Sequence, residues 1–333
     1  MSFISEGRQA QSLDLLQESL ARLEKELAKV IIGQREVARL TLVAFAAGGH
    51  CLLRGVPGLA KTLLVKTLAQ TLHLNFNRIQ FTPDLMPSDI TGTEVIEEDR
   101  STGRRGVRFI RGPIFANIIL ADEINRAPPR TQAALLEAMQ EKQVTAGGVR
   151  YHLEPPFLVL ATENPIEQEG TYHLPEAQLD RFFFELMVDY PELEDERRII
   201  TSTTANDEPQ IEAVMSGEML LELQHAVRDV PIASNIVDFV LRLTRATRPQ
   251  SGEAPVFIKE QVRWGVGPRA GQALILGAKA RALLDGRFAA SFNDVRAIAA
   301  PVLRHRILPN FQAEAEGITS EAIIKRLLAV VSE

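Results

Sequence analysis

Residues 50–72 read "HCLLRGVPGLAKTLLVKTLAQTL", a short apolar segment followed by a glycine-rich turn and then a helical pattern. A phosphate loop requires this order, because the turn presents backbone N–H groups to phosphate oxygens and the helix points its positive end at them. The loop itself, "GVPGLAKT" at residues 55–62, has Ala60 where the strict pattern places a glycine before the lysine. We expect Ala60 to have right-handed helical φ and ψ, a conformation that does not require glycine.

The residue types of this loop suit a nucleoside triphosphate bound with Mg²⁺. Gly55 and Gly58 permit a tight turn, while Lys61 would reach the outer phosphates and Thr62 would ligate the metal. An ordinary structural turn is the alternative, but the strand before the loop and the helix after it favour nucleotide binding. The predicted nucleotide contacts are Ile32, Gly55, Val56, Pro57, Gly58, Leu59, Ala60, Lys61, Thr62 and Leu63.

A second motif, "IILADEIN" at residues 118–125, ends an apolar segment in two acids. A buried parallel strand delivers such residues to the edge of the sheet where ligands bind. Asp122 would hold the Mg²⁺ hydration shell beside Thr62, and Glu123 would orient and polarise the attacking water. Two acids at a strand end are common by chance, but together with the phosphate loop they predict hydrolysis of the nucleotide.

Three further motifs place polar residues that could serve the same site. In "LVLATENP", residues 158–165, Asn164 could touch the γ-phosphate or the water, although an Asn-Pro pair is also an ordinary turn signal. Arg181 in "LPEAQLDRFFF" could equally be a salt-bridged surface residue. Arg269 in "GVGPRA" begins a helix and could reach back to the phosphates, or it could be a simple first-turn charge.

The pattern of apolar segments predicts the fold class. Strands at residues 77–81, 117–122 and 157–162 alternate with helical stretches, which indicates a parallel sheet covered on both faces. Residues 93–113 and 142–153 each show apolar alternation around a turn and are interpreted as inserted β-hairpins, or alternatively as decorative surface hairpins. We therefore expect an α/β core at residues 31–191 with two hairpin inserts, followed by an all-helical lid domain at residues 192–333.

Helix boundaries are also readable in places. An apolar stripe at three- and four-residue spacing predicts an amphipathic helix within residues 1–30, packed on its own domain or on another subunit. Its members are Leu13, Leu16, Leu20, Leu23, Leu27 and Val30. Ser216, Ser234, Ser291 and Ser320 are plausible N-caps, and Gly286 could end a helix that begins near Pro268.

Composition narrows the class of protein. The 333 residues carry a formal net charge of -6, which argues against a protein whose main task is to grip nucleic acid. The single cysteine, Cys51, excludes an intrachain disulfide and fits a reducing compartment. Neither a signal-peptide pattern nor an apolar stretch of the roughly 20 residues that span a bilayer is visible. We expect a cytoplasmic protein without membrane insertion.

Taken in order, these motifs resemble the AAA+ ATPases and, within them, the MoxR family. The resemblance runs from about Ile31 to the C-terminus and rests on "GVPGLAKT", "TPDLMPSDITG", "GPIFANIILADEINRAPPRTQAALLEAMQEKQVT", "ATENP", "LPEAQLDRFFF" and "GPRA". The family's phosphate loop likewise has alanine before the lysine. Glu163 stands where many members of that family have glutamine, a minor departure from the resemblance.

The resemblance implies roles for individual residues. Lys61, Thr62, Asp122 and Glu123 become the Walker residues that bind Mg²⁺ and ATP and hydrolyse the nucleotide. Asn164 becomes the sensor of the γ-phosphate. Arg181 becomes the finger inserted into a neighbouring subunit, and Arg269 the sensor of the helical lid, with Arg126 and Arg130 as alternative fingers. A finger that acts in trans implies a homo-oligomeric ring, most simply a hexamer.

The resemblance also implies a partner and a client. The family suggests a chaperone that remodels protein complexes or inserts metals and cofactors, working with a protein that contains a von Willebrand factor A domain. Arg104, Arg105, Arg108 and Arg111 make the first hairpin locally basic, suited to an acidic client or simply solvated. A nucleic-acid motor, a metal-chelatase motor subunit and a nucleotide-gated scaffold with little turnover are the alternatives, and the net charge weighs against the first of them.

Overall fold

The computed structural model describes residues 18–98, 105–166, 170–205 and 209–332. Of the predicted features, Leu13 and Leu16 of the N-terminal stripe and Arg104 of the first hairpin lie outside the described residues. Residues 18–30 are helical, and Leu20, Leu23 and Leu27 of the stripe are buried. The predicted amphipathic helix is therefore present over these residues and packs within its own chain.

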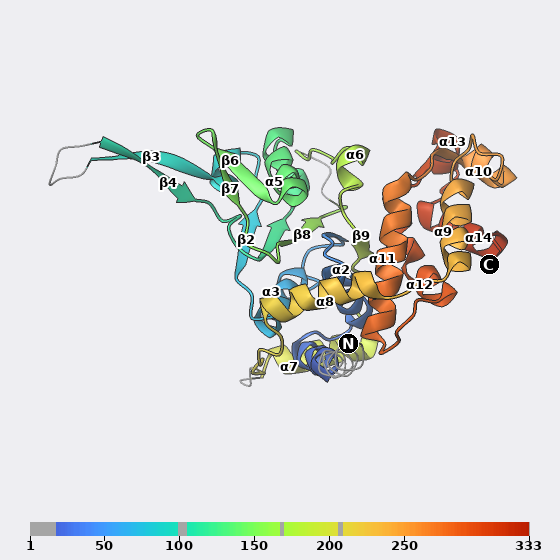
Figure 1. The fold of residues 1–333 in the computed structure, drawn as a ribbon, viewed down its shortest axis with the longest axis horizontal. Coiled ribbons are helices and arrows are strands. Elements are labelled where there is room, and N and C mark those ends of the chain that lie inside the picture. Colours follow the sequence, from blue (N-terminus) through green and yellow to red (C-terminus); the bar gives the residue numbers. More distant parts are fainter. Residues whose placement is uncertain (1–17, 99–104, 167–169, 206–208, 333) are drawn as a thin grey trace, which may run out of the picture.

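A five-stranded parallel sheet forms the centre of the molecule, in the order β2-β5-β8-β1-β9 (Figure 1). The predicted α/β class is confirmed, and each predicted strand lies within one residue of its observed bounds. The edge strand β9 was not expected, because four residues inside an aromatic run give no clear periodicity. The strands are β1 (Cys51–Arg54), β2 (Phe76–Gln80), β5 (Ile118–Asp122), β8 (Leu158–Glu163) and β9 (Phe184–Met187).

Helices cover both faces of this sheet, as side-chain alternation along the strands requires. On one face, Leu53 and Leu160 pack in a single core with α2 (Arg35–Ala46) and α3 (Lys61–Thr71). On the other, Leu52 and Val159 pack in a second core with α5 (Pro129–Glu141). The first core continues into the C-terminal helices, so the lid and the α/β part share one apolar interior.

The two predicted hairpins are present as inserts. The first, β3 (Gly92–Glu98) with β4 (Arg105–Arg111), follows the short helix α4 (Pro87–Thr91) and projects far from the body (Figure 1). The second is β6 (Gln143–Ala146) with β7 (Val149–His152). Phe109 of the first stacks on Tyr151 of the second at 4.2 Å between ring centroids, which fastens one insert to the other.

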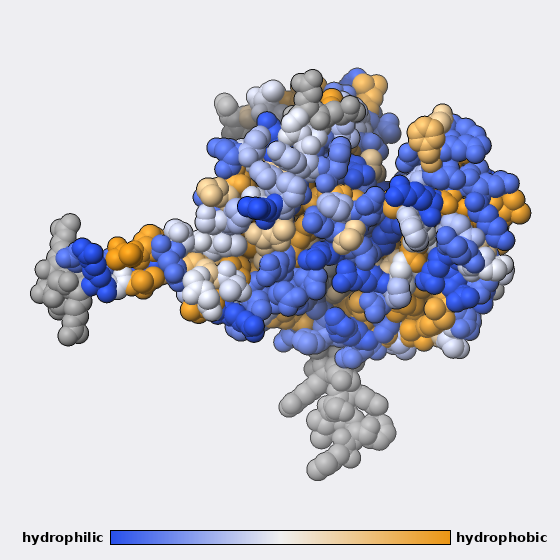
Figure 2. Space-filling view, turned by 90° about the horizontal axis from the view of Figure 1, so that it is seen from above, coloured by the Kyte–Doolittle hydropathy of each residue, from blue (hydrophilic) through white to orange (hydrophobic). Residues whose placement is uncertain are grey.

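The projecting hairpin carries apolar side chains but little net charge. Ile96 and Val107 face each other across it and are 73% and 67% exposed. Figure 2 shows hydrophobic surface along this projection. Its described strands contain three glutamates and three arginines. Arg105 pairs with Glu98 and Arg108 with Glu97 across the strands, so the expected basic character is neutralised within the hairpin.

The described residues of the C-terminal part, 192–205 and 209–332, form helices as expected, apart from one short antiparallel ladder of β10 (Val262–Trp264) with β11 (Leu308–Pro309). Within the described residues, every helix is too short or too polar to cross a bilayer. The remaining helices are η1 (Ile124–Arg126), α6 (Glu176–Leu179), α7 (Leu193–Thr203), α8 (Gly217–Asp229), α9 (Ser234–Ala246), α10 (Val256–Gln261), α11 (Pro268–Leu284), α12 (Phe292–Leu303), α13 (Phe311–Ala315) and α14 (Ser320–Val330).

Two of the four predicted N-caps are confirmed. Ser216 accepts a hydrogen bond from the Met219 amide, and Ser291 forms a reciprocal capping box with Asp294. Ser234 and Ser320 are instead the first residues of their helices, so each helix begins one residue earlier than expected and is capped by the residue before the serine. For the last helix the reason is visible, because the preceding Thr319 hydroxyl already accepts the Ala322 amide.

Candidate nucleotide site

The phosphate loop lies between β1 and α3 and is tightly enclosed on one side. A Cβ at Gly55 would lie 2.4 Å from the Val188 carbonyl oxygen, so only glycine fits there, and Gly58 has φ +85°. The expectation for Ala60 was wrong: it has φ 57° and ψ 20°, in the left-handed region. The chain must turn sharply from the loop into α3, and this alanine accepts the strained conformation that glycine would adopt freely.

Lys61 and Thr62 are the first two residues of α3, with both side chains half-buried. The first N–H groups of a helix have no partner inside it and are free to bind an anion. Lys61 Nζ donates to the Gly55 carbonyl oxygen at 2.5 Å, which folds its ammonium back over the loop. Burial lowers the pKa of Lys61, while the carboxylates of Asp122 and Glu123 oppose that shift, so the three charges lie near one another.

The two acids end β5 on the same edge of the sheet as the loop. Asp122 is buried, accepts a hydrogen bond from the Thr162 hydroxyl at 2.5 Å and forms an ion pair with Arg78 at 2.7 Å. Glu123 has φ 56°, a left-handed conformation held in part by the bond from its amide to the Thr162 hydroxyl. Strained non-glycine residues of this kind are typical of functional sites.

Glu123 is engaged in two interactions that the sequence did not indicate. Its Oε2 accepts hydrogen bonds from Gln80 Nε2 at 2.8 Å and from Arg126 Nη1 at 2.9 Å. The only sequence signal for Gln80 and Arg78 is their alternation as polar residues along the predicted strand at 77–81. Because Arg126 bonds Glu123, the acid predicted to orient the water in its own chain, this geometry does not favour Arg126 as a finger for another subunit.

Asn164 follows β8 directly and is 4% exposed. Its Oδ1 accepts the Ile166 amide at 3.2 Å, which orients the side-chain amide at the end of the strand. The predicted residues Lys61, Thr62, Asp122, Glu123 and Asn164 thus meet at the carboxyl ends of β1, β5 and β8. A γ-phosphate, its metal and an attacking water all require groups at such an edge.

A cavity of about 520 Å³ lies beside the loop, between the start of α2, the end of β9 and the lid. Gln34 Nε2 donates to the Asp189 carbonyl oxygen at 2.8 Å, next to the residue that encloses Gly55. The volume of this cavity is within the range of roughly 300–1,000 Å³ that is typical of ligand pockets, so the cavity has room for the nucleoside. Ile32 immediately precedes its lining, which comprises Gly33, Gln34, Glu36, Val37, Leu40, Leu186, Met187, Asp189, Tyr190, Arg304 and Glu321.

Arg181 and Arg269 lie together at the opposite side of the sheet, where the strands have their amino ends. With His50 and Asp180 they line a small recess, and His50 comes immediately before β1, whereas the phosphate loop follows that strand. Arg181 donates to the Leu136 carbonyl oxygen at 2.8 Å, and Arg269 pairs with Asp180 at 3.5 Å. The expectation that Arg269 reaches back to the phosphates of its own chain is therefore not met in this geometry.

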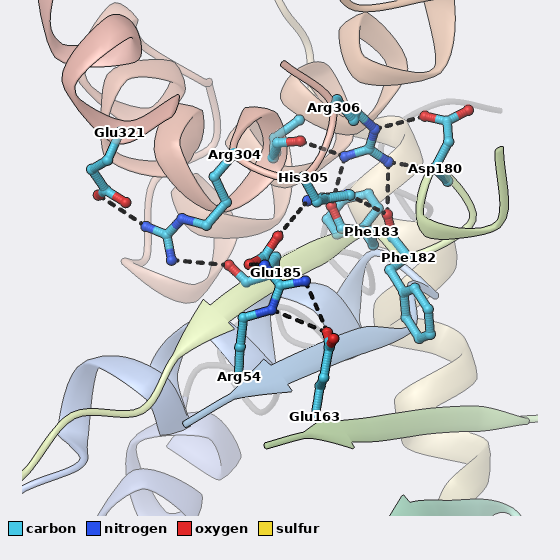
Figure 3. A network of polar contacts seen from close by, with 11 residues as sticks. Arg54, Glu163, Asp180, Phe182, Phe183, Glu185, Arg304, His305, Arg306 and Glu321 are labelled. Carbon is cyan, nitrogen blue, oxygen red and sulfur yellow. Dashed lines mark hydrogen bonds and ion pairs between the residues drawn. The ribbon is translucent and has the colours of Figure 1, made fainter. Parts of the chain in front are cut away.

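A chain of polar contacts runs from the phosphate loop toward that recess (Figure 3). It begins at Arg54, the last residue of β1, and passes through Glu185 of β9 to the lid segment 304–306. Arg306 ends it by pairing with Asp180 at 2.7 Å. Glu163 belongs to this network through an ion pair with Arg54 at 2.8 Å.

Comparison with known proteins agrees with this geometry. The model of the ATPase family associated with various cellular activities (AAA) matches residues 50–184, and the AAA lid domain model matches residues 257–327. The chain is 43% identical to "Chaperone MoxR1" of Mycobacterium tuberculosis, over 94% of this chain and 82% of that protein. It belongs to the MoxR family of AAA+ ATPases.

Two further relatives place this MoxR-family chain in the same way. It is 33% identical to "Protein MoxR" of Paracoccus denitrificans over 92% of both chains. A solved structure from Cytophaga hutchinsonii superposes with a TM-score of 0.92 at 40% identity, covering 99% of each chain. The family assigned from the motifs is thereby confirmed, together with the AAA core and lid architecture.

Proposed function

We propose that this MoxR-family chain is an ATP-driven chaperone that remodels or matures protein complexes. The observation that carries the ATPase part is the convergence of Lys61, Asp122, Glu123 and Asn164 at one sheet edge beside a phosphate loop. The relative named "Chaperone MoxR1" supports the chaperone part. Hydrolysis at the loop supplies the energy, and surfaces elsewhere on the molecule select the client.

The residues present fit Mg²⁺ bound with the nucleotide. Thr62 offers a hydroxyl at the start of α3, and Asp122 offers a carboxylate that Thr162 and Arg78 hold at the end of β5. Hard oxygen ligands of this kind, few in number and completed by phosphate oxygens and water, suit Mg²⁺. When bound, the metal would neutralise charge that develops on the phosphates. Glu123 would then orient the water, and Lys61 would hold the outer phosphates.

A homo-oligomeric ring, most simply a hexamer, is the assembly proposed. Arg181 and Arg269 lie at the amino ends of the strands, opposite their own phosphate loop, so a catalytic role for either guanidinium group would be at the site of a neighbour. Transition-state stabilisation by such an arginine is typically worth about 10³ to 10⁵ in rate. An isolated subunit is therefore expected to hydrolyse ATP poorly.

The proposed partner is a protein with a von Willebrand factor A domain, and the proposed client is a protein complex. The projecting hairpin β3–β4 presents Ile96 and Val107 to solvent, a surface better suited to a protein than to a nucleic acid. The ion-paired arginines of this hairpin and the net charge of -6 of the whole chain also argue against a nucleic-acid motor.

The proposed location is the cytoplasm, because reducing conditions suit the single, buried cysteine of the chain.

The test is capture of the client by a variant that binds ATP and does not turn it over. Glu123→Gln removes the charge that orients the water but keeps the size of the side chain. We expect ATP turnover to fall by at least about 10²-fold and native-cell pull-downs to enrich a client and a von Willebrand-type partner. Lys61→Ala, which lacks the phosphate cation, is the control and should enrich neither. Equal capture by both variants, or turnover stimulated by DNA and lost with salt, would contradict the chaperone assignment.

A further inference from the structure

Arg54 joins three neighbouring strands of the central sheet. Its Nε and Nη2 donate to Glu163 Oε2 on β8 at 3.1 and 2.8 Å, and its Nη1 donates to Glu185 Oε1 on β9 at 2.7 Å (Figure 3). The order β8-β1-β9 places Arg54 on the middle strand, with one carboxylate on each side. A planar guanidinium can hold two such groups at once in fixed directions, which an ammonium cannot do.

The position of this clamp in the chain connects it to the nucleotide site. Arg54 immediately precedes Gly55, where the phosphate loop begins, and Glu163 immediately precedes Asn164. Arg54 and Glu163 are register partners in the ladder of β1 with β8, and the Gly55 amide donates to the Glu163 carbonyl oxygen at 3.3 Å. Any sliding or splaying of β8 against β1 would therefore move Asn164 relative to the loop.

The clamp is also anchored on its far side. The Glu185 side chain is only 3% exposed, and its main-chain carbonyl oxygen accepts a hydrogen bond from Arg304 of the lid at 3.2 Å. Burial raises the pKa of Glu185, and the guanidinium groups of Arg54 and Arg304 oppose that shift. Arg304 continues the contact outward to Glu321 at 3.1 Å, so Glu185 is fixed between β1 and the lid.

Stability alone does not account for these charges. Buried ion pairs pay a large desolvation cost, and replacing them by apolar residues of similar size is often neutral or stabilising. The parallel strands β8, β1 and β9 are already joined by their backbone ladders. What an arginine with two carboxylates adds is a fixed direction between the carboxyl end of β1 and its two neighbouring strands. This bears on catalysis because reacting groups must be held to within about 1 Å.

We propose that Arg54 is a positioning residue for ATP hydrolysis, which fixes Asn164 against the phosphate loop by holding Glu163 and Glu185. The inference rests on the proposed role of Asn164 at the γ-phosphate. The side-chain contacts of Arg54 are to the carboxylates of Glu163 and Glu185, so we assign it a positioning role and no contact with the reacting groups. Its effect should therefore appear in the chemical step and depend on Asn164.

A double-mutant cycle of Arg54→Met and Asn164→Ala tests this dependence through ATP turnover and ADP affinity. We expect Arg54→Met to lower kcat by about 10- to 100-fold, because a displacement of about 1 Å at the reacting groups costs that much. ADP affinity should stay within about threefold, since ADP lacks the γ-phosphate. The double variant should be no slower than Asn164→Ala alone, because residues that act as a unit are not additive.

Removal of Arg54 takes the guanidinium partner away from two buried carboxylates, so a second variant guards against a folding defect. Arg54→Met combined with Glu163→Gln and Glu185→Gln removes that excess charge and should retain a folded ring with the same loss of kcat. Arg54→Lys should recover only part of the rate, since it cannot hold two carboxylates in fixed directions. Arg245→Met, which breaks an exposed ion pair with Glu253 in the lid, is the matched control and should turn over normally.

The outcomes separate this inference from the proposed function. Absence of turnover by the unchanged protein would count against the ATPase assignment. Amide hydrogen exchange at residues 162–164 then tests the clamp alone, with faster exchange in the triple variant as the expected result. Additive losses in the cycle, unchanged kcat in Arg54→Met, or unchanged exchange would overturn the positioning role. Equal losses of kcat and of ADP affinity would likewise overturn it, because they describe a general distortion of the loop.

Discussion

At the scale of single residues, Ala60 shows how backbone conformation decides what the phosphate loop tolerates. Its left-handed conformation costs an L-residue about 1–2 kcal/mol, and glycine would remove this strain while costing about 0.4–1 kcal/mol of unfolded-chain entropy. We expect Ala60→Gly to raise the free energy of unfolding by up to about 1.5 kcal/mol and to keep nucleotide binding. Denaturant unfolding and ADP titration measure both quantities.

The matched control for this change is Ala69→Gly, in the buried interior of the same helix. There the native conformation is right-handed, and glycine is expected to lower stability by about 1 kcal/mol or more. If both substitutions destabilise alike, Ala60 is not strained, and its left-handed conformation has no energetic consequence.

His50 gives the molecule a pH dependence of stability. Its Nδ1 accepts the Val159 amide at 3.0 Å and its Nε2 donates to the Met139 carbonyl oxygen, so the buried ring is bonded as a neutral imidazole. Burial lowers the pKa of His50 to about 4. The unfolded chain, with a histidine pKa near 6.5, thus binds more protons between these values, and stability falls as the pH drops from about 6.5 to about 4.

The expected loss from this one group is about 3 kcal/mol, measured as the free energy of unfolding across that pH range. His50→Gln offers the same donor and acceptor without a titrating ring and should flatten part of the slope. A remaining slope is expected from His305, whose pKa burial also lowers. An unchanged slope in His50→Gln would show that His50 does not control the acid sensitivity.

At the scale of elements, the two hairpin inserts depend on each other. A two-stranded hairpin is marginal by itself in water, and β3–β4 is fastened by the stack of Phe109 on Tyr151. Such aromatic pairs contribute about 0.5–1.5 kcal/mol beyond the area they bury. We expect Tyr151→Ala to increase protease cleavage within β3–β4 several-fold while ADP affinity stays unchanged.

Phe311→Ala is the control, because that ring is 86% exposed in the lid. It should leave the cleavage rate of β3–β4 as it is. Equal cleavage of Tyr151→Ala and the unchanged protein would show that the stack does not hold the projecting hairpin in place.

Element type was easier to predict than element boundaries. The strands at residues 77–81 and 157–162 were found to within one residue because their apolar runs are flanked by clear turns. The cap at α14 shifted by one because Ser320 and Thr319 are chemically similar, and only the backbone decides which hydroxyl reaches the Ala322 amide. The edge strand β9 exists because its backbone pairs with β1, a contact between distant segments.

At the scale of the whole molecule, Arg181 and the phosphate loop lie at opposite ends of the strands. This placement predicts nucleotide sites that are completed by an arginine from the neighbouring subunit. Arg181→Ala subunits keep their own loop, and Lys61→Ala subunits keep Arg181. Each variant alone is expected to be at least about 10²-fold slower, since a finger arginine is worth about 10³ to 10⁵. A one-to-one mixture should regain measurable ATP turnover, because Lys61→Ala subunits can supply the arginine that their neighbours lack.

The control mixture combines Lys61→Ala with Glu123→Gln, two changes at the same sheet edge. Both types of subunit then have a defective site, and no turnover should return. If mixed Arg181→Ala and Lys61→Ala subunits are no faster than either alone, Arg181 does not act across a subunit interface.

The sequence by itself determined the α/β class, the loop residues Lys61 and Thr62, the acids Asp122 and Glu123, and the family, because these depend on neighbours along the chain and on residue type. Only the tertiary structure placed Gln80 and Arg126 on Glu123, and Arg181 with Arg269 at the far edge of the sheet. The same applies to Glu163. Its carboxylate became half of an ion pair with Arg54 only when β8 and β1 came side by side, because a charge acquires its role from the partner that the fold brings to it.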